Sequence, residues 1–149
     1  MKVALIACQA YVVLFIALHD WIPLGRLNNL EGIRAADGRS RLFVVTAAST
    51  APFLAGLVGS IQHAASVFPA WLEWCLWLSY LAAAYGVLRT WWIPYLFASN
   101  PGRRARNEVR FAGTHSFLPE RNGIRPDTLH VSFHAVLFTT IALLALAGR

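Results

Sequence analysis

Four long apolar stretches follow one another along the chain, separated by shorter polar segments. Each is close to the ~20 residues that a helix needs to cross the hydrocarbon core of a bilayer. The pattern predicts an all-α membrane protein, a bundle of four transmembrane helices that forms a single domain over residues 1–149. We expect these helices at about residues 3–22, 42–62, 70–95 and 128–147.

The composition supports this prediction. Hydrophobic residues make up 57% of the chain and charged residues only 13%. A soluble domain has about 25% charged residues, because its surface has to be hydrated. The composition therefore argues against a soluble enzyme, a nucleic-acid-binding domain and a disordered segment.

The basic residues predict how the chain is oriented. Loop 25–41 contains four arginines and loop 98–127 contains six, whereas segment 63–69 contains neither lysine nor arginine. The positive-inside rule places the two basic loops in the cytoplasm and both termini outside, in a bacterial inner membrane. The net charge of +6 then indicates contact with anionic headgroups of the inner leaflet rather than with nucleic acid.

A short internal repeat divides the chain into two halves. Trp-Ile-Pro occurs at residues 21–23 and 92–94, where the first and third helices are expected to end. Gly-Ile-Arg occurs at residues 32–34 and 123–125, ahead of the second and fourth helices. The order is consistent with two helical hairpins in parallel orientation, related by an axis along the membrane normal.

Several motifs resemble those of a family of small bacterial four-helix membrane proteins that has no known activity. They are Leu-His-Asp-Trp-Ile-Pro-Leu at residues 18–24, Trp-Trp-Ile-Pro-Tyr-Leu-Phe at 91–97, Thr-His-Ser-Phe-Leu-Pro at 114–119 and Thr-Leu-His at 128–130. Ala98 and Asp127 stand where that family usually has Gly and Asn. The resemblance implies the four-helix membrane fold and carries no chemistry.

Ionisable side chains at the membrane edge are the best functional evidence, because such groups are costly at membrane depth unless they are paired or functional. Most of them are expected at the cytoplasmic ends of three helices. We expect them to converge around one cytoplasm-facing ligand pocket, with residues 114–126 folding over it as a lid. The predicted site consists of His19, Asp20, Arg89, His115, His130 and His134.

Two pairs within this set suggest specific interactions. His130 and His134 are four residues apart, so they share one face of a helix. Asp20 and Arg89 are at similar depth on the first and third helices, where they could form an interhelical ion pair. We expect no cofactor and no metal, although His130, His134 and Asp20 would be the ligands of a metal if one were bound.

Three functions fit these features. The first is the binding or transport of a small anionic or lipid-like ligand in the predicted pocket. The second is a membrane-embedded enzyme that acts on a lipophilic substrate. The third is an accessory subunit whose small-residue helix faces dock a partner membrane protein or a second copy of the chain. The sequence does not decide whether the protein is an enzyme.

Overall fold

The chain is mostly helical in the part that the computed structural model describes, residues 1–147. No strand occurs within this range, so the prediction of an all-α protein is confirmed. The long helices are α1 (Lys2–Leu18), α3 (Arg39–Gln62), α4 (Ala70–Val87) and α7 (Thr128–Ala147). The shorter elements are η1 (Gly25–Leu27), α2 (Leu30–Asp37), η2 (Leu88–Trp92), α5 (Ile93–Leu96) and α6 (Pro101–Arg110).

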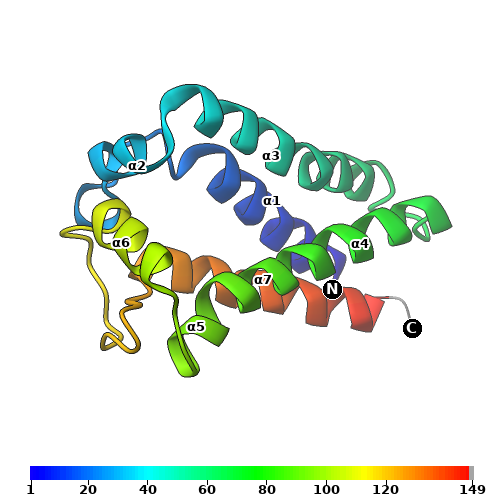
Figure 1. Cartoon of the computed structure of the whole chain (residues 1–149). Helices are drawn as coiled ribbons and strands as arrows, with labels where there is room; N and C mark the ends of the chain where they lie inside the picture. The colour runs from blue at the N-terminus through cyan, green and yellow to red at the C-terminus, as the bar shows by residue number, and fades with distance from the viewer. Residues whose placement is uncertain (148–149) are drawn as a thin grey trace.

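The four long helices surround one apolar core (Figure 1). Each packs against two others, because α1 and α4 both contact α3 and α7. Helices α1 and α4 run in one direction and α3 and α7 in the other, which is the order that two parallel hairpins require. The core is made of side chains that are almost fully buried, including Leu5, Val12, Leu72, Leu76 and Leu137.

Two of the described helices, α3 and α7, are long and apolar enough to cross a membrane. Helix α1 is equally apolar in character but one turn shorter than the predicted segment 3–22, since the chain turns at His19 and Asp20. The regular α-helix of α4 stops at Val87, but the helical path of the chain continues beyond it. Through η2 and α5 the chain remains helical as far as Leu96, close to the predicted end at residue 95.

Helices α3 and α4 meet at one end and diverge toward the other (Figure 1). Their close approach depends on two glycines of α3. A Cβ atom on Gly56 would lie 2.7 Å from Leu76, and one on Gly59 would lie 2.7 Å from Leu72. Because both leucines are buried in the core, these glycines set how closely the two helices can pack.

The two basic loops contain short helices that pack against each other at the open end of the bundle (Figure 1). Asn29 caps α2 by accepting a hydrogen bond from the backbone N–H of Gly32, and Asn100 caps α6 in the same way through Arg103. Such caps satisfy backbone donors that have no partner within the helix. At the contact, a Cβ atom on Gly32 would lie only 2.2 Å from the backbone oxygen of Val109.

Element η2 is a π-helical turn, in which the backbone N–H of Ile93 bonds to the carbonyl of Leu88. Pro94 follows directly; it has no N–H, and its ring crowds the carbonyl four residues earlier. The wider turn accommodates this proline. Turns of this kind are rare and are often found at functional sites.

We predict that Gly56→Ala lowers the free energy of unfolding by about 1–3 kcal/mol, because its new methyl group must displace Leu76 from the core. Gly86→Ala is the matched control, since a Cβ atom at Gly86 meets nothing within 4 Å and alanine favours a helix. Denaturation of both variants in detergent measures the difference. Equal stabilities would contradict the proposed role of Gly56.

Candidate functional site

A cleft of about 860 Å³ lies where α3 and α4 diverge. Its walls are formed by small and apolar side chains of these two helices, among them Val45, Pro52, Ala83 and Gly86. Helices α1 and α7 form its floor, and α6 borders it at the end where the charged residues lie. The cleft is therefore apolar over most of its length and charged at one end.

Arg110 of α6 is at the centre of the charged end. Its Nη2 atom donates to both carboxylate oxygens of Asp20, at 3.0 and 2.8 Å, and its Nη1 atom donates to Asp37. The side chains of Arg110, Asp20 and Asp37 are only 15%, 8% and 6% exposed. This guanidinium thus joins the end of α1 to the end of α2 through buried, charge-assisted hydrogen bonds.

Two further arginines share the carboxylate of Asp37. Arg106 forms an ion pair with it, and a nitrogen of Arg41 lies 3.6 Å from it. Unlike Arg110, both of these side chains are largely exposed, at 47% for Arg106 and 64% for Arg41. They retain donors that can reach a molecule bound in the cleft.

His19 lies beside Asp20 at the end of α1. Its Nδ1 atom is 2.7 Å from the carbonyl oxygen of Phe15, and its Nε2 atom is 3.1 Å from a carboxylate oxygen of Asp20. Both ring nitrogens therefore face acceptors. Burial nevertheless lowers the pKa of His19 to about 4, so near neutral pH the ring is uncharged and donates from only one of its nitrogens.

Asp127 orients His130 at the start of α7. One oxygen accepts the backbone N–H of His130 at 2.8 Å, and the other lies 2.7 Å from its Nδ1 atom. Burial by itself would raise the pKa of Asp127, but the hydrogen bonds from His130 and from the backbone outweigh it, and the pKa lies below its usual 3.8. Asp127 is thus a buried carboxylate that holds the imidazole in one orientation.

Aromatic rings surround His130 on several sides. The ring centroids of Trp91, Phe111, His19 and Phe15 lie 4.8, 5.3, 5.4 and 5.5 Å from that of His130. Trp91 belongs to the π-helical turn, and Phe111 follows α6 directly. These rings fix the position of His130 at the charged end of the cleft.

Four of the six residues in the predicted site line this cleft: His19, Asp20, His130 and His134. His134 is buried, and its Nδ1 atom has no hydrogen-bond partner among the described residues. Whether these side chains bind a ligand stays a prediction.

Arg89 and His115 do not line the cleft. Arg89 is exposed, and its backbone carbonyl accepts a hydrogen bond from Arg103 at 3.0 Å. The predicted ion pair between Asp20 and Arg89 is wrong, because Arg110 occupies the carboxylate instead. Arg89 precedes the two residues of η2, Thr90 and Trp91, that do face the cleft.

His115 is also exposed, with its Nδ1 atom 2.7 Å from the hydroxyl of Thr128. Its backbone bonds to Arg26 and Thr128, so this segment packs beside the bundle. The prediction that residues 114–126 cover the site as a lid is wrong. Helix α6 takes that place, through Arg103, Arg106 and Arg110.

Sequence reasoning missed four residues of the site: Asp37, Arg106, Arg110 and Asp127 acting as the partner of His130. The first three lie in segments read as basic loops, where an arginine signals topology rather than position. Asp127 entered the sequence analysis only as the residue that stands where the resembled family usually has Asn. Its position three residues before His130, on the first turn of a helix, was the available signal.

Among residues 1–147, no group of three or more His, Cys, Asp or Glu side chains is arranged to hold a metal ion. Of the three ligands considered, Asp20 is bound to Arg110 and His19, and His130 to Asp127. The ring centroids of His130 and His134 are 6.4 Å apart.

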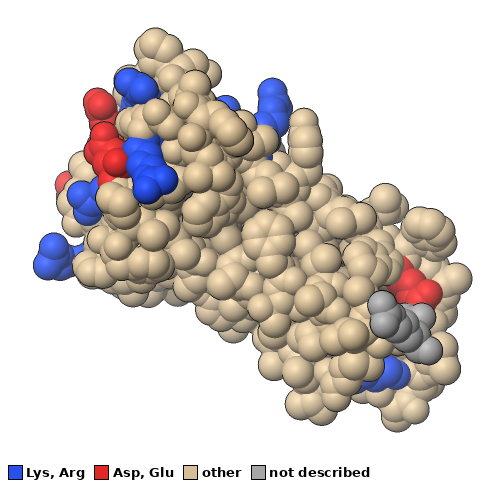
Figure 2. Space-filling view, turned by 90° about the horizontal axis from the view of Figure 1, so that it is seen from below, with Lys and Arg blue, Asp and Glu red and all other residues tan. Residues whose placement is uncertain are grey.

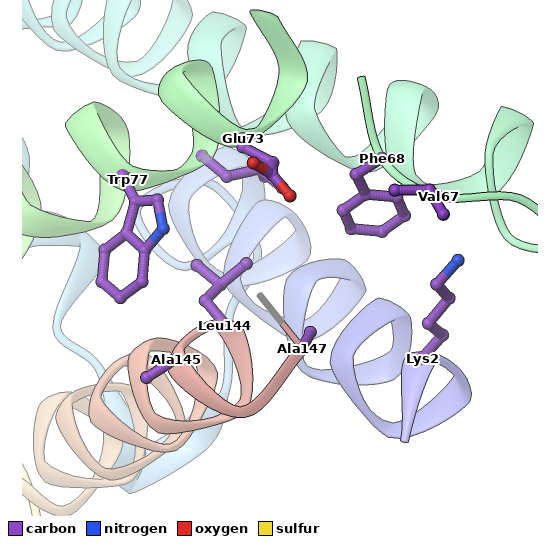
Figure 3. A pocket seen from close by; sticks show the side chains of 9 residues that line it. Lys2, Val67, Phe68, Glu73, Trp77, Leu144, Ala145 and Ala147 are labelled. Carbon is purple, nitrogen blue, oxygen red and sulfur yellow. The ribbon is translucent and has the colours of Figure 1, made fainter. Parts of the chain in front are cut away.

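A second cavity, of about 330 Å³, lies at the other end of the bundle. Figure 3 shows Glu73 and Trp77 of α4, Phe68 of the preceding turn and Lys2 of α1 around it. The ammonium group of Lys2 lies 4.8 Å from the centre of the Phe68 ring and donates to the backbone carbonyls of His63 and Ser66. Because Lys2 is engaged in holding the turn to α1, we place the candidate site in the larger cleft.

Comparisons with protein-family models, with curated proteins and with solved structures find no match. The interpretation of the site therefore rests on its own geometry.

We predict that Arg110→Gln destabilises the fold by on the order of 3 kcal/mol, because it leaves the buried carboxylates of Asp20 and Asp37 without their shared cation. The control is Arg89→Gln, which removes the same positive charge from an exposed position. It should change the free energy of unfolding by less than about 0.5 kcal/mol. Chemical denaturation in detergent compares the two variants. A larger effect at Arg89 would restore the pairing that the sequence predicted.

Proposed function

We propose that the chain crosses the membrane four times and that its cleft binds an amphipathic molecule with an anionic head group. The ligand would enter sideways between α3 and α4, from the leaflet on the side of α2 and α6. The main support is the composition of the cleft, which combines apolar walls with an arginine-rich end.

The outer surface of the bundle supports a membrane location for all four long helices. Large apolar side chains are more than half exposed on α1, α3 and α4, among them Val3, Phe43, Trp74 and Leu78. Figure 2 shows that the charged side chains on this face gather toward the two ends, with uncharged surface between them. Water would hydrate such a surface poorly, whereas lipid tails would cover it at no cost.

The charge of the cleft favours an anion. Four arginines and two aspartates line its charged end, which leaves two more fixed positive charges than negative ones. Arg110 is saturated by two carboxylates, but Arg41 and Arg106 are open to solvent. Guanidinium groups bind phosphate and carboxylate oxygens through directed hydrogen bonds.

The shape of the cleft favours a single-chain amphiphile. Its volume lies in the range of about 300–1,000 Å³ that is typical of ligand sites. Its apolar walls belong to α3 and α4, which diverge toward the end of the bundle where α2 and α6 lie (Figure 1). An acyl chain can follow these walls while the head group remains near Arg106 and His130.

The expected orientation can be tested by cysteine labelling, after Cys8 and Cys75 have been replaced by alanine. Because the ten arginines of the two basic loops hold α2 and α6 in the cytoplasm, Ala105→Cys should resist a membrane-impermeant maleimide in intact cells. Ala65→Cys, in the turn between α3 and α4, should react. Both should react in permeabilised cells, and the reverse pattern in intact cells would overturn the topology.

Ligand binding can be tested with lysophosphatidylglycerol, a single-chain lipid with a phosphodiester head. We expect Gly86→Trp to weaken its binding at least about tenfold, or 1.4 kcal/mol, because the indole occupies the cleft. The purified protein in a non-ionic detergent serves for this titration.

The matched control is Tyr85→Trp, because Tyr85 is the adjacent residue, is 66% exposed and faces away from the cleft. It should bind lysophosphatidylglycerol as the unmodified protein does. An uncharged monoacylglycerol with the same chain should bind more weakly to all three proteins. Equal binding by Gly86→Trp and Tyr85→Trp would refute the proposed site.

A further inference from the structure

The Nε2 atom of His130 is free to interact with a ligand at the charged end of the cleft. The other ring nitrogen, Nδ1, is engaged by Asp127 at 2.7 Å. Within residues 1–147 no group forms a hydrogen bond with Nε2, although the residue lines the cleft. In the neutral ring, Nδ1 carries the only proton and donates it to Asp127, so Nε2 exposes a lone pair.

A lone pair at Nε2 repels the oxygen atoms of an anionic head group. An anion can hydrogen-bond to this nitrogen only when Nε2 carries a proton, which makes the ring an imidazolium. We propose that an anionic head group binds at His130 together with one proton, which is taken up from solvent onto Nε2. This inference rests on the proposed function of the cleft and adds proton linkage to it.

The surroundings of His130 suit a proton that arrives with the ligand. The carboxylate of Asp127 is 1% exposed and lies against Nδ1, where its negative charge stabilises an imidazolium. His19 lies nearby, with its ring centroid 5.4 Å from that of His130, and its ring is uncharged near neutral pH because it is buried.

The other ionisable groups near His130 are either paired with each other or more deeply buried than His130. The groups that face His130 from the elements packed against it are Asp127 and His134 of α7, His19 and Asp20 at the end of α1, and Arg110 of α6. Asp20 and Arg110 neutralise each other. His134 is buried, so it is less accessible to a head group than His130.

The number of protons bound with the ligand can be measured directly. Titration calorimetry with lysophosphatidylglycerol, in two buffers of different ionisation enthalpy, gives the protons exchanged on binding. This probe is chosen because its phosphodiester does not titrate near neutral pH, so any proton taken up resides on the protein. We expect a net uptake of protons when the ligand binds, and therefore an affinity that falls as the pH is raised.

Three variants locate the proton. His130→Gln should bind more weakly and take up no proton, whereas His19→Gln should still take one up. His63→Gln, at the opposite end of the bundle, is the control and should match the unmodified protein in both respects. If His130→Gln does not fold, Asp127→Asn replaces it, and it should lower both the affinity and the proton uptake.

Two results would overturn the inference. One is binding by the unmodified protein with the same heat in both buffers, after correction for dilution. The other is uptake that persists in His130→Gln or disappears in His19→Gln, which would place the proton elsewhere. Absence of any binding would instead refute the proposed function of the cleft, and the inference with it.

Discussion

The bidentate contact between Arg110 and Asp20 determines how the polar end of this molecule is arranged. Through the same guanidinium, Asp37 is held as well, so one side chain fastens α6 to the ends of both α1 and α2. Buried ion pairs contribute little net stability, but removing one partner is costly. The contact therefore acts mainly by fixing geometry: it places α6 across the end of the cleft and keeps two carboxylates neutralised close to the histidines.

Two glycines allow α6 to lie close enough for this contact. Gly32 leaves room for the backbone of Val109, and Gly123, with φ near +70°, lies where a Cβ atom would meet the side chain of Arg104. Both are the first residues of the repeated Gly-Ile-Arg motif, and the following residues, Ile33 and Ile124, are almost fully buried. The motif thus has a packing role at α6 in each half of the chain.

The sequence predicted where the long helices lie and which ionisable residues share one end of the bundle. It did not predict which way their side chains point. Apolar length located the four long helices, and membrane depth brought His19, Asp20, His130 and His134 to one level. The partner of Asp20 could not be found in this way, because Arg110 belongs to a segment that the sequence marked only as a basic loop. Choosing between Arg89 and Arg110 requires the π-helical turn before Pro94, within which Thr90 and Trp91 face the cleft. It also requires the docking of α6, which hydrophobic periodicity does not indicate.

The same ion pairs divide the arginines of the cleft into two groups. Arg110 donates hydrogen bonds to Asp20 and Asp37, and these two carboxylates compensate its positive charge within the protein. Arg41 and Arg106 share Asp37 but remain open to solvent. Because the charge of Arg110 is balanced by these carboxylates, the proposed binding of an anion would depend on the exposed arginines and on the proposed charge of His130. Buried arginines that hold the fold together and exposed arginines that keep free donors can therefore share one carboxylate, and their burial rather than their residue type distinguishes them.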